Sequence, residues 1–136
     1  GYVRGEGAGF FVLKPLHKAL ADGDPIHGVI RGSAVNHCGK THTLSYPSAQ
    51  AQADVIVEAH RRSGVPILSV NFVELHGTGT AKGDPIEFEG LRLAFARLAE
   101  EQGIALEDAY CGLSSAKTNL GHLEAAAGMA GVVKVL

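Results

Sequence analysis

The chain has 136 residues, and its 12 Lys and Arg residues nearly balance its 14 Asp and Glu residues, so its formal net charge is −2. This balance gives no electrostatic reason to expect binding to nucleic acid or to an acidic membrane, because such binding needs clustered positive charge. Hydrophobic residues at 46% and charged residues at 19% exclude a disordered chain, and no apolar run approaches the roughly 18 residues of a membrane span. A cytoplasmic location is expected, because two cysteines make no disulfide framework and no leader pattern is present.

The first half of the chain alternates apolar stretches of strand length with helical patterns, which is typical of an α/β architecture. Strands are expected at residues 10–13 and 26–32, with a short helix at residues 16–21 between them. A longer helix is expected at residues 48–63, because Ser48 is a good N-cap residue and glycine and proline follow its end.

The second half continues this alternation, with strands expected at residues 70–75 and 110–116. Residues 84–87 read Asp-Pro-Ile-Glu, a capping box with proline at the first helical position, and Gly103 provides the stop signal of that helix. The pattern therefore predicts a third helix between these two strands.

The final segment, residues 123–136, is predicted to be a helix that is buried on every side. Between Glu124 and Lys134 it has no charge on any face, and a helix that is apolar all round is buried all round. Such burial needs more protein than this chain supplies. Because the chain also starts with Gly1 and ends within an apolar run, residues 1–136 are interpreted as a piece of one domain without an internal boundary.

No metal site and no cysteine nucleophile are expected. His37, Cys38 and His42 lie close in sequence, but no second pair of ligands completes a four-ligand site. Cys111 lies in an apolar stretch and is interpreted as a small buried side chain. Neither cysteine has the setting of a nucleophile, which is a strand-to-helix turn with backbone donors.

One candidate site is the glycine-rich turn at residues 76–80, His-Gly-Thr-Gly-Thr, which directly follows a predicted strand. Ligands of open α/β sheets bind at the carboxyl ends of strands, where His76 is expected. The glycines allow close approach of a ligand chain, and the hydroxyls of Thr78 and Thr80 can hydrogen-bond it. From this segment alone, a histidine that only caps the turn is the alternative.

A second candidate site, residues 117–122, reads Lys-Thr-Asn-Leu-Gly-His and also follows a predicted strand. Lys117 and Glu124 are expected to pair beside His122, because an unpaired charge at the mouth of an apolar region is costly. Two imidazoles at the ends of neighbouring strands could direct two N–H groups at one oxygen. This arrangement is what stabilises an enolate or a tetrahedral oxyanion.

These two segments resemble the histidine motifs of β-ketoacyl synthases, in particular those of the ketosynthase domains of modular type I polyketide synthases. Further stretches resemble the family in the same order, so the resemblance spans nearly the whole chain; they are residues 1–9, 30–36, 83–87 and 123–128. The resemblance implies a thiolase-like αβαβα fold, in which two α/β halves stack in five layers around a buried central helix. The chain would supply the end of the N-terminal half and most of the C-terminal half.

The resemblance also implies an acyltransferase reaction. In the family, a cysteine takes an acyl chain from the phosphopantetheine arm of an acyl carrier protein. Malonyl carrier protein is then decarboxylated, and its enolate attacks the acyl thioester in a Claisen condensation that elongates the polyketide. Carried over by position, His76 and His122 would donate hydrogen bonds to the malonyl thioester oxygen, and Lys117 would organise the site with Glu124.

The substrates would reach the site on phosphopantetheine, and the resemblance implies no cofactor bound by the domain itself. Thr78 and Thr80 would contact the pantetheine arm, and the loop after Asn36 would border its tunnel. The intact domain would be a homodimer. The family places its nucleophile in a Thr-Ala-Cys-Ser-Ser motif that this chain does not contain, so these residues alone are expected to be inactive.

Two alternative functions are kept. A non-elongating ketosynthase would hold an acyl chain as a gating module, but such domains commonly lack the first histidine, whereas His76 is present. A fatty-acid β-ketoacyl synthase more often has serine where Gly79 stands, which favours the polyketide class.

Overall fold

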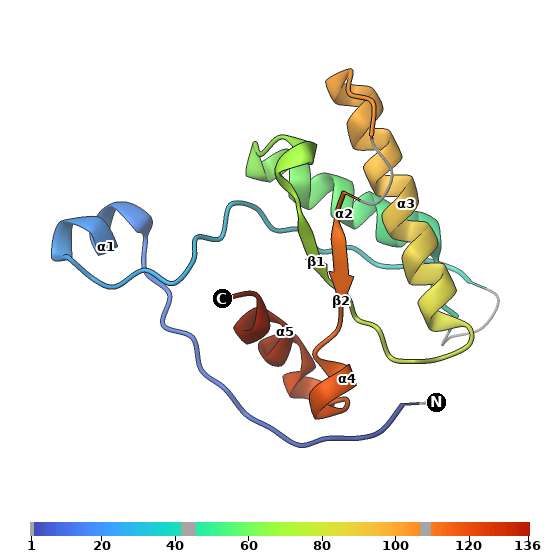
Figure 1. Ribbon diagram of the computed structural model, residues 1–136, viewed down its shortest axis with the longest axis horizontal. Coiled ribbons are helices and arrows are strands. Elements are labelled where there is room, and N and C mark those ends of the chain that lie inside the picture. The colour runs from blue at the N-terminus through green and yellow to red at the C-terminus, as the bar shows by residue number, and fades with distance from the viewer. Residues whose placement is uncertain (1, 42–45, 107–109) are drawn as a thin grey trace.

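The computed structural model describes residues 2–41, 46–106 and 110–136 (Figure 1). Its helices and strands follow in the order α1 (Leu16–Asp22), α2 (Ala49–Ser63), β1 (Phe72–Glu74), α3 (Gly83–Gln102), β2 (Gly112–Ser114), α4 (Lys117–Leu120) and α5 (Ala127–Val135). Short 3-10 helices, η1 (Ile67–Ser69) and η2 (Glu124–Ala126), precede β1 and α5. No helix among these residues is long and apolar enough to cross a membrane.

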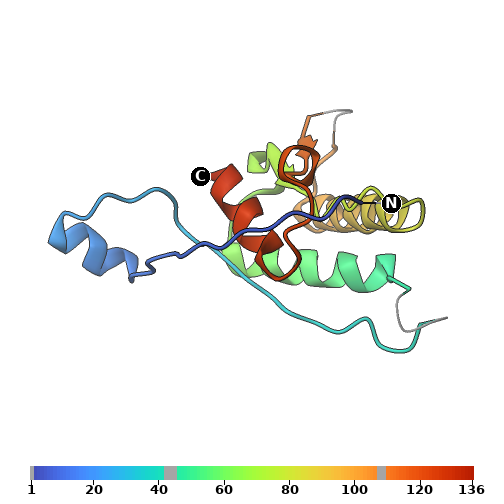
Figure 2. The ribbon, with the colours of Figure 1, turned by 90° about the horizontal axis from the view of Figure 1, so that it is seen from below.

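The two strands form a parallel pair, as the crossover through α3 requires. Phe72 is opposite Gly112, and Glu74 is opposite Ser114. Figures 1 and 2 show α3 and α5 on opposite sides of this pair. The parallel arrangement places the carboxyl ends of both strands together, so the residues that follow β1 and β2 are neighbours.

The hydrophobic core lies between α2, α3 and η1. Its five fully packed members come from these three elements and are Ala53, Val57, Ile67, Ala94 and Leu98. Small residues on the facing helix surfaces let α2 and α3 approach closely, and Figure 2 shows the two helices side by side. This core anchors the amino-terminal end of β1 through η1.

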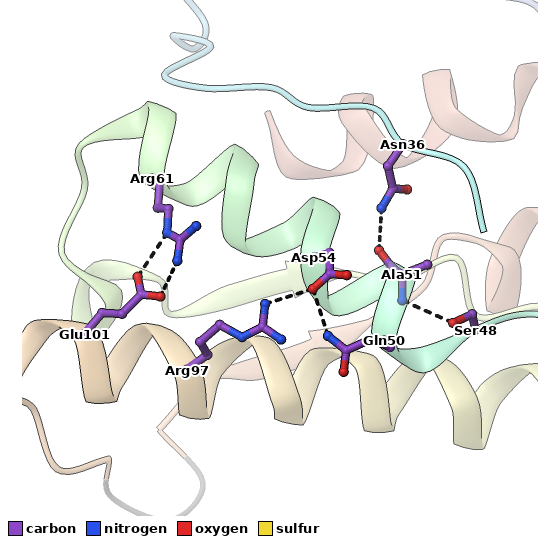
Figure 3. Close-up of polar contacts among 8 residues, drawn as sticks. All are labelled: Asn36, Ser48, Gln50, Ala51, Asp54, Arg61, Arg97 and Glu101. Carbon is purple, nitrogen blue, oxygen red and sulfur yellow. Dashed lines mark hydrogen bonds and ion pairs between the residues drawn. The ribbon is translucent and has the colours of Figure 1, made fainter. Parts of the chain in front are cut away.

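Polar contacts line the edges of the α2–α3 interface (Figure 3). Arg97 of α3 pairs with Asp54 of α2 at 2.8 Å, and Arg61 pairs with Glu101 at the other end of the helices. Exposed pairs of this kind contribute little to stability, because solvent screens the two charges. The alignment of α2 on α3 therefore depends mainly on the buried apolar contacts.

The start of α2 is confirmed, whereas the predicted capping box of α3 is wrong. Ser48 Oγ accepts a hydrogen bond from the backbone N–H of Ala51 at 3.2 Å, as expected of an N-cap. Helix α3 begins at Gly83, whose N–H donates to Thr80 Oγ1 at 3.0 Å. Glu87 does not cap this helix, because its carboxylate is occupied by the turn that follows β1.

The predicted strands at residues 10–13 and 26–32 are also wrong for this chain. Both segments lack ladder hydrogen bonds, and Phe10 and Val12 are 96% and 98% exposed. Backbone becomes a strand only when a neighbouring edge pairs with it, and neither of the described strands pairs with these segments. Figures 1 and 2 show α1, between them, standing apart from the rest of the chain.

Helix α5 is shorter and more exposed than expected. No residue of α5 is buried, and Val133 is 62% exposed. The reason is that its neighbours within the described chain are β1 and the N-terminal segment, where Met129 lies against Gly9. The helix starts only at Ala127, after η2 and the positive φ of 51° at Glu124.

Candidate active site

The turn that holds His76 is fixed by a carboxylate from α3. The backbone N–H groups of His76 and Gly77 donate to Glu87 Oε1 and Oε2 at 2.6 and 2.8 Å. Ser115 Oγ donates to the carbonyl oxygens of the same two residues at 3.4 Å. Both sides of the turn are therefore hydrogen-bonded, and the imidazole leaves the end of β1 in a defined direction.

The rest of this turn is held by the start of α3. Gly79 N–H donates to Asp84 Oδ1 at 3.1 Å, and the hydroxyls of Thr78 and Thr80 lie 3.2 Å apart. Thr80 Oγ1 also accepts the backbone N–H of Gly83. The hydroxyl of Thr78 contacts only Thr80 among these groups, so it keeps capacity for a further hydrogen bond. Glu87 and Asp84 are the site residues that the sequence interpretation missed; the signal was two carboxylates on the helix directly after the glycine-rich turn.

His122 is held by the N-terminal segment of the chain. The backbone N–H of His122 donates to Val3 O at 2.7 Å, and its backbone carbonyl accepts the N–H of Gly5 at 2.9 Å. Arg4 and His122 therefore form a parallel bridge. The ring nitrogen Nδ1 of His122 accepts the backbone N–H of Glu124 at 2.9 Å. In the neutral ring the proton therefore sits on Nε2, which is left as a donor.

The structure brings the two predicted histidines together. The ring centroids of His76 and His122 lie 5.4 Å apart with the planes at 88°. The Tyr2 ring lies 4.8 Å from the other side of His122, which itself is only 9% exposed. This confirms the prediction that the segments after the two strands meet, because β1 and β2 end at the same edge.

The predicted pair between Lys117 and Glu124 is wrong. Glu124 Oε1 lies 3.5 Å from Arg4 Nε and accepts the Tyr2 hydroxyl at 3.2 Å. The side chain of Glu124, whose φ is positive, therefore contacts the N-terminal segment. Lys117 instead lowers the pKa of His76 through its positive charge.

The pKa of His76 is lowered from its ordinary 6.5, first by partial burial of the ring and next by the positive charge of Lys117. Both effects disfavour the imidazolium. Glu87 acts in the opposite direction with a smaller effect. The neutral form of His76 therefore predominates at pH 7.

A titration should reveal this electrostatic coupling. In an NMR titration of a complete ketosynthase domain containing these residues, His76 is expected to have its midpoint below 6.5, and Lys117→Met should move that midpoint upward. Lys82→Met is the matched control, because Lys82 is not among the charges that shift His76. A wild-type midpoint at or above 6.5, or no response to Lys117→Met, would contradict the assignment. Because the pKa of His76 is lower in the folded domain than its ordinary value of 6.5, protonation of His76 favours the unfolded chain. The contribution of His76 to the stability of the domain is therefore fully present above pH 6.5 and is lost as the pH falls through the lowered pKa.

A pocket of about 1110 Å³ lies beside this turn. His76, Thr78 and Thr80 line it together with residues 36–41, so the loop after Asn36 borders the site as expected. The exposed Cys38 lies in that loop. Cys111 directly precedes β2 and is half-buried, not fully buried as expected, and this burial raises the pKa of its thiol.

The side chains considered as metal ligands do not form a cluster in the described part of the chain. Within residues 2–41, 46–106 and 110–136, no three His, Cys, Asp or Glu side chains are grouped to hold a metal ion. His42, which was considered with His37 and Cys38, lies outside the described residues, as does Gly1.

The geometry of two facing histidines at the ends of parallel strands agrees with the sequence comparisons. The chain belongs to the β-ketoacyl synthase family, since residues 27–136 match its C-terminal domain, described as "Beta-ketoacyl synthase, C-terminal domain". It is 52% identical over its whole length to polyketide synthase PksN of Bacillus subtilis and 55% identical to polyketide synthase ThaG of Burkholderia thailandensis. The chain spans about 2% of the length of each of these relatives.

Solved structures show the same relationship. A ketosynthase from module 6 of the bacillaene synthase of Bacillus subtilis 168 superposes with a TM-score of 0.81 at 43% identity, covering 90% of this chain and 20% of that one. The oxazolomycin ketosynthase domain OzmH KS7 of Streptomyces albus JA3453 gives 0.81 at 42% identity, with the same coverage. The thiolase-like α/β class is thereby confirmed.

Proposed function

We propose that these residues form the two-histidine part of a ketosynthase that elongates polyketides by decarboxylative Claisen condensation. The observation that supports this most strongly is the 5.4 Å separation of the His76 and His122 rings. At that distance, one N–H from each ring can reach a single oxygen. Two donors directed at one oxygen stabilise the negative charge that develops there.

The protonation states favour donation over proton transfer. His122 receives Glu124 N–H at Nδ1, so its Nε2–H is the donor. The lowered pKa of His76 keeps that ring neutral at pH 7, so it too has one N–H. Neutral donors stabilise an enolate without protonating it, and the enolate therefore keeps the electron pair that it needs for attack.

In the proposed reaction, the bond between the malonyl α-carbon and its carboxylate breaks, and its electron pair moves onto the thioester oxygen as CO2 leaves. His76 and His122 hold that oxygen. The enolate carbon then forms a new bond to the acyl carbonyl carbon, and the nucleophile's thiolate leaves. The nucleophile is assigned to neither cysteine of this chain, because neither Cys38 nor Cys111 lies in a strand-to-helix turn and burial raises the pKa of the Cys111 thiol.

The remaining roles follow from position. Burial of the ring and, after it, the charge of Lys117 favour neutral His76, and Glu124 orients His122 through its backbone N–H. Thr78 and Thr80 contact the phosphopantetheine arm from the pocket wall. The substrates are thus acyl and malonyl thioesters of an acyl carrier protein, the enzyme works as a homodimer in the cytoplasm, and no bound cofactor takes part.

The test uses a complete ketosynthase domain that contains these 136 residues, loaded with an acyl chain and supplied with malonyl carrier protein. We expect CO2 release matched one to one by a 3-ketoacyl product two carbons longer. Acyl loading without CO2 release would contradict elongation and would support the gating alternative. A domain supplied with unmodified carrier protein, which lacks phosphopantetheine, is the control.

A further inference from the structure

A buried carboxylate lies two residues before His76 and has no part in the proposed reaction. Glu74 ends β1, and its side chain is only 12% exposed. Its Oε1 accepts the backbone N–H of Ala116, the residue directly before Lys117. One carboxylate therefore joins the strand that leads to the first histidine to the segment that leads to the second.

The other oxygen of Glu74 faces a lysine from α5. Oε2 lies 3.2 Å from Lys134 Nζ but accepts no hydrogen bond, and the ammonium donates to Ser114 Oγ on β2. The contact between Glu74 and Lys134 is thus one of opposite charges. A buried carboxylate without such a partner would be strongly disfavoured.

The backbone of α5 leaves space for this arrangement. A Cβ atom at Gly131 would lie 3.3 Å from Glu74 Cγ, which is tighter than ordinary contacts, so glycine at this position lets the helix approach the acid. Glu74, Lys134 and Ser114 then connect β1, α5 and β2 at the level where the strands end.

We propose that the Glu74–Lys134 pair is a positioning device that sets the separation of His76 and His122. This inference rests on the proposed function. Glu74 fixes the start of α4 relative to β1 through Ala116 N–H, and α4 leads within six residues to His122. Loss of the carboxylate shifts α4 relative to the His76 turn, and the two N–H groups then no longer meet at one oxygen.

The test measures decarboxylation and acyl loading separately, in a complete ketosynthase domain containing these residues. Glu74→Ala should lower the rate of malonyl decarboxylation by about 10- to 100-fold, because a displacement near 1 Å can cost about 100-fold. Acyl loading does not use the two histidines and should change by less than about 2-fold. For each variant, both rates are measured at the same number of degrees below its own melting temperature.

A conservative pair of variants covers the case in which Glu74→Ala does not fold. Glu74→Gln keeps an acceptor for Ala116 N–H but leaves Lys134 without its counter-charge, so decarboxylation should fall by about 5-fold. Adding Lys134→Met removes that unpaired charge and should restore most of the rate. Glu58→Ala is the matched control, because it removes an acid whose ion pair with Arg62 is exposed.

Two results would overturn the positioning role. One is a folded Glu74→Ala domain with the wild-type decarboxylation rate, and the other is an equal fall in loading and decarboxylation, as general destabilisation would give. Failure of the proposed function looks different, because decarboxylation would then also survive His122→Ala. Full activity of Glu74→Ala beside an inactive His122→Ala domain would reject the positioning role alone.

Discussion

Replacing His122 with alanine is expected to lower malonyl decarboxylation by at least about 100-fold while the nucleophile can still be acylated. Removal of a single donor to a developing oxyanion typically costs about 100- to 1000-fold in rate. His122 is buried, and its Nε2–H is the donor left free by the contact of Nδ1 with Glu124 N–H. The neighbouring Tyr2 hydroxyl does not take its place, because it donates to Glu124 Oε1.

The measurement is CO2 release from malonyl carrier protein, with acyl loading followed by intact-protein mass spectrometry. His27→Ala is the control, because His27 is exposed and lies outside the helices and strands that carry the site. Decarboxylation at the wild-type rate in the His122→Ala domain would refute the role assigned to this histidine.

Gly121→Ala is expected to lower the stability of the domain by at least about 2 kcal/mol and to abolish most decarboxylation. Gly121 has φ 73° and ψ −175°, a region that is essentially restricted to glycine and costs other residues about 1–3 kcal/mol. A Cβ there would also lie 2.9 Å from Val3 O, the acceptor of the His122 N–H. The substitution therefore separates His122 from the segment that holds it.

Thermal unfolding and CO2 release measure the two effects. Gly64→Ala is the control for an ordinary left-handed glycine, because Gly64 has a positive φ, 64°, and nothing lies within 4 Å of a Cβ there. We expect Gly64→Ala to cost about 1 kcal/mol of stability and to leave decarboxylation unchanged. Equal losses of stability and activity in the two variants would contradict the larger cost assigned to Gly121.

The elements with strong local signals could be predicted from the sequence. Ser48 and the glycine after residue 63 set the limits of α2, and both act as expected. The meeting of His76 and His122 followed from two strands that end at one edge. The strands at residues 10–13 and 26–32 could not be judged from local pattern, because pairing depends on a partner that periodicity does not reveal.

The errors within the site share one physical cause. Glu87 and Glu124 were each assigned the nearest plausible partner in sequence, a helix cap and Lys117. In the folded chain, Glu87 accepts hydrogen bonds from a turn ten residues earlier, and Glu124 pairs with Arg4 at the opposite end of the chain. Long-range partners of carboxylates are set by tertiary structure, so sequence spacing alone could not identify them.

The most direct test of the two-histidine site is a crystal structure of a complete ketosynthase domain containing these residues, bound to a non-hydrolysable malonyl thioester analogue. We expect its carbonyl oxygen to lie within about 2.7–3.2 Å of a ring nitrogen of both His76 and His122. An ordered analogue whose carbonyl oxygen contacts neither imidazole, or only one of them, would contradict the account.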